Sequence, residues 1–234
     1  MSYEIPQIAF AGAADPASII KKGQARFTIL TSRMIRMEYD DTGNFEDRPS
    51  QAIWFRKQPV PSIRTNHQEN VLEIDTGVLT LKYKDTPQGF SPDTLSIAFN
   101  EKDTIWRDGD RDNQNLKGTG RTLDNANGAI PLENGLLSRA GWSLVDDSQS
   151  LVFNDQGWLE LRQTHILHPE TLDLYFLGYG NDYLGCLNDF CKIAGNVPLV
   201  PRWILGNWWS RYWEYSQEEL TDLMKEFHKR EIPL

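Results

Sequence analysis

Residues 115–148 bring together the side chains best suited to bind a ligand. The segment reads NLKGTGRTLDNANGAIPLENGLLSRAGWSLVDDS, and within it Arg121, Thr122 and Asp124 lie among glycines. A guanidinium and a carboxylate form charge-assisted hydrogen bonds, and glycine leaves the backbone free to shape a concave site. A loop of this length inside a compact domain is uncommon and is often functional. The composition is compatible with a ligand site and with a well-structured surface loop.

Three alternating aspartates, Asp108, Asp110 and Asp112, resemble the opening of a calcium-binding loop. Such a loop needs glycine at its sixth position and a bidentate glutamate at its twelfth. Asn113 and Thr119 occupy those positions here. The segment is therefore predicted to be a solvated acidic turn, and no metal or other cofactor is expected.

The overall composition excludes several classes of protein. The formal net charge is −9, whereas a nucleic-acid surface needs clustered lysine and arginine. No stretch approaches the 18 or so apolar residues of a membrane-spanning helix, and the N-terminus lacks the pattern of a signal peptide. Cys186 and Cys191 point to different sides of a predicted helix, so no disulfide is expected. These features favour a cytoplasmic protein without nucleic-acid or membrane partners.

Short strands follow one another along most of the chain. Residues 26–32, 34–40, 52–55, 96–100, 142–145, 151–153, 158–162 and 172–177 carry strand patterns, and residues 71–84 form the clearest hairpin, around Gly77. Strands at such spacing, with no helices between them, indicate an antiparallel sandwich. Residues 1–197 are accordingly predicted to be a mainly β domain, an antiparallel β-sandwich.

The pattern changes near the C-terminal end. Asp182 is a predicted N-cap of a helix that Gly195 ends, and a proline-containing linker follows. The segment PRWILGNWWSRYW then reads as a strand and an aromatic loop, and Ser216 opens a capping box before a second helix. Residues 198–234 therefore predict a linker and one βα unit of a second domain.

Two segments of the chain resemble glycoside hydrolase family 31, the family of the α-glucosidases. They are residues 115–148, quoted above, and residues 177–234, LGYGNDYLGCLNDFCKIAGNVPLVPRWILGNWWSRYWEYSQEELTDLMKEFHKREIPL. The resemblance implies a mutarotase-like N-terminal β-sandwich followed by the first βα unit of a (β/α)₈ barrel. It also implies a retaining, exo-acting α-glycosidase that uses two aspartates and no cofactor. Both aspartates belong to later barrel strands, so residues 1–234 are expected to hold no catalytic residue and to be inactive alone.

The resemblance assigns substrate-binding positions within the chain. In the family, a loop of the N-terminal domain helps to bind the leaving sugar, and Arg121 and Asp124 match that loop; alternatively, they pair with each other to hold it. Arg211 and Trp213 follow the first barrel strand, at the catalytic face of a barrel. For both, packing or anchoring of the loop is the competing interpretation.

The intact protein is therefore predicted to hydrolyse non-reducing α-linked glucose from oligosaccharides. An α-xylosidase or α-transglucosylase of the same family is the alternative enzyme, and a non-catalytic carbohydrate-binding sandwich is the alternative outside enzymes. The rings of residues 203–213 are expected to lack some of their natural partners in this chain, so the segment is predicted to be disordered, to pack on the sandwich, or to pack on a neighbouring copy in a homo-oligomer.

Overall fold

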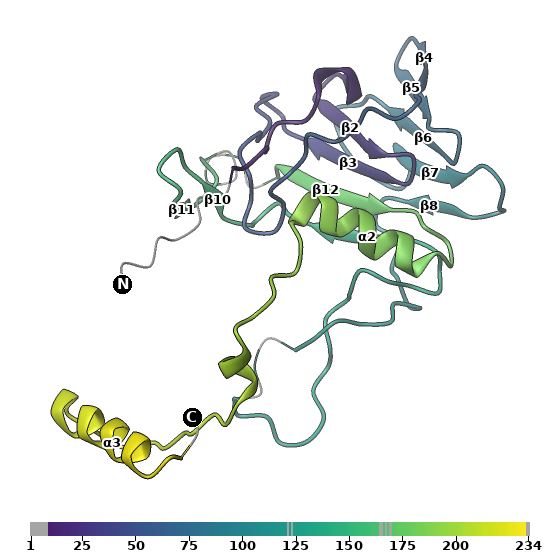
Figure 1. The fold of residues 1–234 in the computed structure, drawn as a ribbon. Coiled ribbons are helices and arrows are strands. Elements are labelled where there is room, and N and C mark those ends of the chain that lie inside the picture. Colours follow the sequence, from purple (N-terminus) through teal and green to yellow (C-terminus); the bar gives the residue numbers. More distant parts are fainter. Residues whose placement is uncertain are drawn as a thin grey trace. The chain divides into compact units, whose positions relative to one another are not determined.

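The computed structural model describes residues 9–120, 122, 124–163, 166, 168 and 170–232. Its contacts divide the chain into two compact units, Met1–Gly195 and Asn196–Leu234. The regular elements of the first unit are mainly antiparallel strands, as predicted, and Figure 1 shows two of its sheets face to face. Each unit is described by itself below.

The first sheet contains five strands in the order β1-β2-β3-β12-β9, all paired antiparallel. Residues 25–31 and 34–39 alternate between apolar and polar side chains, the period that places one face of a strand against a core. They form the predicted hairpin across Ser32 and Arg33. The strands are β1 (Ile19–Lys22), β2 (Ala25–Thr31), β3 (Met34–Tyr39), β12 (Leu172–Leu177) and β9 (Ser143–Asp146).

The second sheet runs in the simple order β4-β5-β6-β7-β8, so each strand pairs with the next along the chain. Its central hairpin is the one predicted around Gly77, which has a φ of +85° that favours glycine. Asp75 Oδ1 accepts a hydrogen bond from the Gly77 N–H at 2.7 Å and closes the turn. The strands are β4 (Arg64–Gln68), β5 (Val71–Asp75), β6 (Leu79–Lys84), β7 (Leu95–Phe99) and β8 (Ile105–Arg107).

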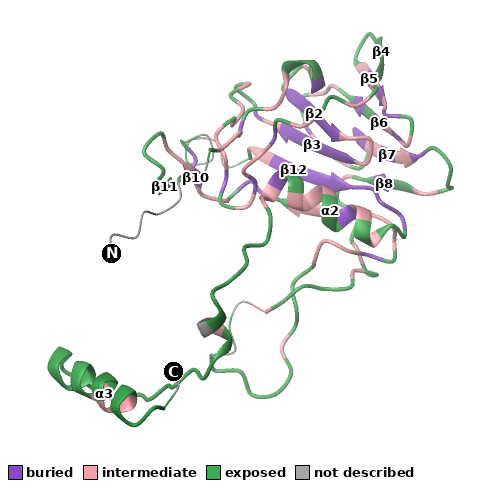
Figure 2. Cartoon of the chain, viewed as in Figure 1, coloured by how far each residue is buried: buried purple, intermediate pink, exposed green. Residues whose placement is uncertain are grey.

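The apolar core lies between these two sheets. Phe27, Met37 and Phe176 from the first sheet pack with Leu81 and Trp106 from the second, and all five are fully buried. Figure 2 shows the buried residues concentrated in the strands. A small third sheet pairs β10 (Val152–Phe153) with β11 (Leu159–Glu160), and a short 3₁₀ helix, η1 (Pro16–Ser18), precedes β1.

Helix α2 (Tyr183–Ala194) covers part of the outer face of the first sheet (Figure 1). As predicted, Asp182 caps its start, accepting a hydrogen bond from the Gly185 N–H at 3.0 Å, and Gly195 ends it. Beneath the helix, Cys186 and Ile193 pack on residues of the sheet such as Tyr175. Both cysteines are free thiols, as expected.

The rest of that outer face holds a buried group of charged side chains. Arg36 binds Asp173 through two hydrogen bonds of 2.7 and 2.8 Å, and Arg26 binds Glu38 in the same way at 2.6 and 2.8 Å. Arg162 donates to Asp173 at 2.7 Å. All five residues are at most 5% exposed. Paired, hydrogen-bonded charges of this kind are tolerated inside a protein, but removing one partner leaves the other uncompensated.

The pKa of Asp173 determines how this group responds to acid. Burial disfavours the ionised carboxylate, but Arg36, followed by Arg56 and Arg162, outweighs that effect and holds the pKa well below its usual value. Asp173 therefore stabilises the fold above the pKa of the unfolded chain, about 3.9, and this contribution is lost as the pH falls below that value. We expect the midpoint of urea unfolding to drop between pH 7 and about pH 3, and to drop less in an Asp173→Asn variant. Equal pH dependence of the two proteins would contradict this role.

The second unit holds the 3₁₀ helix η2 (Arg202–Leu205) and helix α3 (Gln217–Lys229). The predicted capping box is confirmed: the Ser216 side chain accepts from the Glu219 N–H at 3.2 Å, and the Glu219 carboxylate accepts from the Ser216 N–H at 2.8 Å. The strand predicted in PRWILGNWWSRYW is wrong. Residues 202–205 of this segment form η2, and the described residues from 196 to 232 include no strand. A strand needs a neighbour to satisfy its backbone groups, and none lies in the described part of this unit.

Other differences from the sequence prediction lie in the first unit. The predicted strand at residues 52–55 is wrong, because Phe55 makes only an isolated bridge to Ala11. The short strands β1, β4 and β8 were not predicted, and β4 is exposed along its whole length. Among the described residues, no helix is both long enough and apolar enough to cross a membrane.

Candidate functional site

The long segment after β8 forms an arm whose two sides are hydrogen-bonded to each other near its base. Its two sides run antiparallel: the Leu116 N–H donates to Leu137 O at 2.9 Å, and the Gly118 N–H donates to Glu133 O at 2.8 Å. The Arg139 N–H donates to Gln114 O at 3.0 Å near the base. The term "arm" below means residues 114–139. These bonds link residues about twenty positions apart, so the local sequence does not reveal them.

Asn115 anchors the base of the arm through both ends of its amide. Its Oδ1 accepts from the N–H groups of Lys117 and Gly135, each at 2.8 Å. Its Nδ2 donates to Gly135 O at 3.0 Å and to Asp112 Oδ2 at 2.8 Å. Asp112 Oδ1 in turn accepts from the Ser138 hydroxyl at 2.7 Å. One side chain therefore joins both sides of the arm to the segment that precedes it.

Gly135 is needed because the two sides of the arm approach closely there. A Cβ atom at this position would lie 2.6 Å from Lys117 O, a backbone atom that can move only if the arm itself shifts. Gly135→Ala should therefore separate the two sides, at a cost typical of overpacking, about 1–3 kcal/mol. We expect the Leu116 and Arg139 amides to exchange their hydrogens about tenfold faster or more. Gly118→Ala is the matched control, because its Cβ would meet no atom closer than 3.5 Å; equal exchange in the two variants would contradict the steric explanation.

The tip of the arm carries Asp124, one of the predicted substrate-binding residues. It lies in an exposed turn, where its N–H donates to Thr122 Oγ1 at 3.1 Å. Asn125 follows with a φ of +60°, a conformation that asparagine tolerates better than most residues. Arg121 lies outside the described residues. The role of Asp124 in binding the leaving sugar stays a prediction, as does that of Arg121.

Arg211 and Trp213 lie in the exposed aromatic segment of the second unit. The Arg211 guanidinium lies 4.9 Å from the centre of the Trp213 ring, and its Nη1 donates to the Tyr215 hydroxyl at 3.3 Å. A cation–π contact of this kind holds the two side chains together by about 0.5–1 kcal/mol at an exposed site. Trp213 is 62% exposed, so much of its ring remains open to a ligand. The structure thus brings these two residues together, and their roles also stay predictions.

The alternating aspartates do not converge on one point. Asp110 Oδ2 accepts from the Arg107 N–H at 2.8 Å, whereas Asp112 is engaged by Ser138 and Asn115. Within the described ranges, no group of three or more His, Cys, Asp or Glu side chains is placed to hold a metal ion. The carboxylates at this position organise the backbone of the turn.

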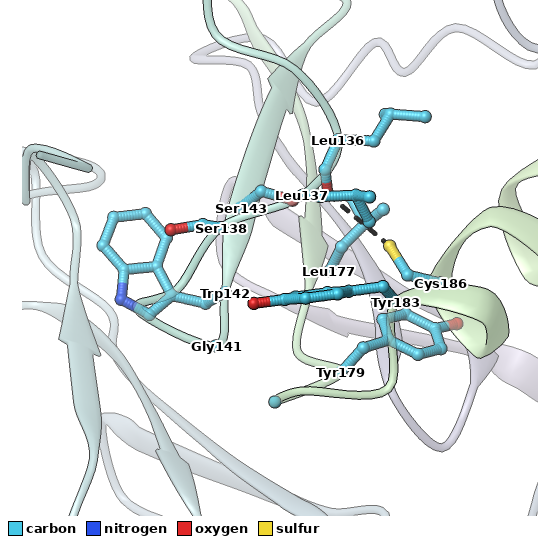
Figure 3. A pocket seen from close by; sticks show the side chains of 11 residues that line it. Leu136, Leu137, Ser138, Gly141, Trp142, Ser143, Leu177, Tyr179, Tyr183 and Cys186 are labelled. Atoms are coloured by element: carbon cyan, nitrogen blue, oxygen red, sulfur yellow. Dashed lines mark hydrogen bonds between the residues drawn. The ribbon is translucent and has the colours of Figure 1, made fainter. Parts of the chain in front are cut away.

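A small cavity beneath the start of α2 is too small to bind a sugar. It is lined by residues that include Leu136, Leu177, Tyr179 and Cys186, and its volume is about 10 Å³ (Figure 3). The Cys186 thiol donates to Leu136 O across it at 3.5 Å. Such a volume holds about one water molecule at most. The cavity is therefore a packing feature of the core under the helix.

Comparison with known proteins identifies relatives by sequence. No protein-family model matches the chain. A protein named α-xylosidase from Saccharolobus solfataricus is 31% identical over 103 residues, which are 42% of this chain and 13% of that protein. An uncharacterized family 31 glucosidase, ORF2, from Pseudescherichia vulneris is 28% identical over 60 residues, 26% of this chain and 11% of that protein. The chain thus matches only a small part of the length of these curated relatives.

A solved structure shares the fold. It is a GH31 α-xylosidase from a soil metagenome in complex with xylose, with a TM-score of 0.57 and 11% identity over 92% of this chain and 39% of that chain. At this identity the similarity concerns the fold alone. The chain thus resembles an α-xylosidase and a family 31 glucosidase in part of its sequence, and a GH31 α-xylosidase in its fold.

Proposed function

We propose that the protein to which this chain belongs is a retaining, exo-acting α-glycosidase, which releases the non-reducing terminal sugar of α-linked oligosaccharides. The observation that carries the proposal is the 31% identity to a protein named α-xylosidase over 103 residues. Retaining hydrolysis uses one carboxylate as nucleophile and a second, about 5–5.5 Å away, as general acid and base. Both carboxylates are expected beyond residue 234, on barrel strands that follow the unit begun by residues 198–234.

Glucose and xylose are the two candidate sugars. Glucose is the sugar expected from the motifs of residues 115–148 and 177–234, and one relative is named a family 31 glucosidase. The name of the α-xylosidase relative supports xylose to the same degree. The two sugars differ by one hydroxymethyl group, and side chains of the barrel would select between them. An α-transglucosylase uses the same first step and differs in the acceptor, a sugar instead of water.

Four residues of this chain complete the proposed site. Asp124 and Arg121 would bind hydroxyls of the leaving sugar from the tip of the arm, with charge-assisted hydrogen bonds. Arg211 and Trp213 would lie at the catalytic face of the barrel, as a stacked pair that shapes its mouth. The proposal includes no cofactor. The proposal also includes a cytoplasmic location, with which the two free thiols are compatible. A homo-oligomer is compatible with the proposal as well.

The proposal is tested by a panel of aryl α-glycosides offered to the complete enzyme. We expect hydrolysis of the α-glucoside or the α-xyloside, with the α-anomer of the sugar as first product. Residues 1–234 alone should hydrolyse neither. Failure of the complete enzyme on every α-glycoside would favour the other candidate, a non-catalytic carbohydrate-binding sandwich.

A further inference from the structure

A second cavity lies at the base of the arm and has no role in the site proposed above. Its volume is about 410 Å³, within the range of roughly 300–1,000 Å³ that is usual for ligand pockets. The cavity is bordered by residues 110–113, 115 and 117, which follow β8, by residue 134 on the other side of the arm, and by residues 142 and 144 at and just before the start of β9. β8 and β9 are edge strands of the two large sheets. Asp124, at the tip of the arm, is not among the lining residues.

Trp142 gives the cavity a rigid aromatic wall. Its ring centre lies 6.3 Å from that of Trp106 and 6.4 Å from that of Phe176, and both of these rings are fully buried. Trp142 itself is only partly buried. Figure 3 shows its indole pointing away from Cys186 and Tyr183 of α2. A ring held by the core on one side can receive a ligand on the other without first losing conformational freedom.

The polar lining of the cavity is balanced in charge. Asp110 and Asp112 supply two carboxylates, and Arg111 and Lys117 supply two cations. Part of this lining is already ordered, since Asp112 accepts from Asn115 and Ser138, and Lys117 Nζ donates to Asn134 Oδ1 at 2.7 Å. A lining that carries no net charge has little preference for an anion or a cation. Its mixed donors and acceptors suit hydroxyl groups, each of which both donates and accepts.

Arg111 and Asn113 are the side chains best placed to contact a ligand there. Both line the cavity and both are exposed. Neither side chain forms a hydrogen bond or ion pair within the described part of the chain, so their donors and acceptors remain available. Together with Trp142 they offer an aromatic face, a guanidinium and an amide within one cavity.

We infer that this cavity binds a neutral oligosaccharide, with one sugar ring against Trp142 and its hydroxyls on Arg111 and Asn113. The negative face of an indole attracts the partly positive C–H groups on the flat side of a sugar ring. The site is a binding site on the β-sandwich and does not require the chain to hydrolyse anything.

The experiment is an NMR titration of the 234-residue chain with two probes, maltotriose and xylotriose. The Trp142 indole N–H signal is assigned by its absence in Trp142→Phe, a variant that keeps an aromatic ring on the core. With either probe, this signal should shift and saturate by about 20 mM, as for a Kd of about 1 mM. In Arg111→Ala the Kd should rise about tenfold, the expected loss for a charge-assisted hydrogen bond of about 1.4 kcal/mol.

A matched variant separates this site from its surroundings. Arg107→Ala removes an exposed arginine of β8 that does not line the cavity, and it should bind the probes as the unchanged chain does. The inference is overturned if neither probe shifts the Trp142 signal, if Arg111→Ala and Arg107→Ala bind equally well, or if inorganic phosphate shifts the signal more than the sugars do. None of these results depends on whether the complete enzyme is an α-glycosidase.

Discussion

Replacing Asp173 with asparagine should lower the free energy of unfolding by about 3–5 kcal/mol, the cost of removing one partner from a buried ion pair. The Asp173 carboxylate accepts two hydrogen bonds from Arg36 and one from Arg162, at 2.7 to 2.8 Å. An amide fills the same space but carries no charge, and its NH₂ group would face a guanidinium. Urea unfolding followed by tryptophan fluorescence measures the change.

The control is an acid-to-amide change in an exposed ion pair of the same unit. Glu73 lies 3.0 Å from Lys82 on the second sheet, and their side chains are 37% and 60% exposed. Exposed pairs contribute about 0–1 kcal/mol, so Glu73→Gln should have little effect. If Asp173→Asn cost no more than Glu73→Gln, the buried charges would not stabilise the sandwich as described. A variant that fails to fold agrees with the expectation, since a loss of this size is a large fraction of a typical domain stability of about 5–15 kcal/mol.

Asp124→Ala in the complete enzyme should lower kcat/KM on an α-linked disaccharide about 10- to 100-fold. The proposed role of Asp124 is to accept hydrogen bonds from the leaving sugar, and a hydrogen bond to a charged group contributes about 1.5–3 kcal/mol. An aryl α-glycoside has no leaving sugar, so its hydrolysis should change by less than about threefold. Because Asp124 lies in an exposed turn, the substitution should leave folding intact.

The comparison between the two substrates decides this prediction. A small and equal effect on both would remove Asp124 from the binding of the leaving sugar. A large and equal effect on both would instead point to a role in the positioning of the barrel. Asn127→Ala serves as a neighbouring control, because it changes an exposed polar residue of the same end of the arm without removing a charge.

The caps and the hairpins could be predicted from the sequence because their causes are local. The alternation along β2, β3 and β12 places every second side chain in the core, and Gly77 supplies the positive φ of its turn. Asp182 and Ser216 cap their helices through bonds to amides three residues away. Each of these features depends on side chains that are close together in the chain.

Two features of the first unit depend on distant segments and could not be predicted in this way. The polar positions of β2 and β3 read as solvent-facing, yet Arg26, Arg36 and Glu38 are buried beside Asp173, more than 130 residues away. The arm reads as an irregular loop, yet its two sides pair across about twenty residues. In the same way, the sequence singled out Asp124 at the tip of the arm but not Trp142, Arg111 and Asn113, which only the folded base of the arm brings together.

The segment PRWILGNWWSRYW is predicted to form a strand followed by an aromatic loop. Residues 202–205 form η2 instead, and the described residues from 196 to 232 include no strand. The sequence by itself determined the antiparallel sandwich and the helix ends, because the periodicity and the capping residues that cause them lie in neighbouring positions. Only the tertiary structure decided which polar faces are buried, how the arm is held and which apolar run becomes a strand, because each of these needs a partner from elsewhere in the chain.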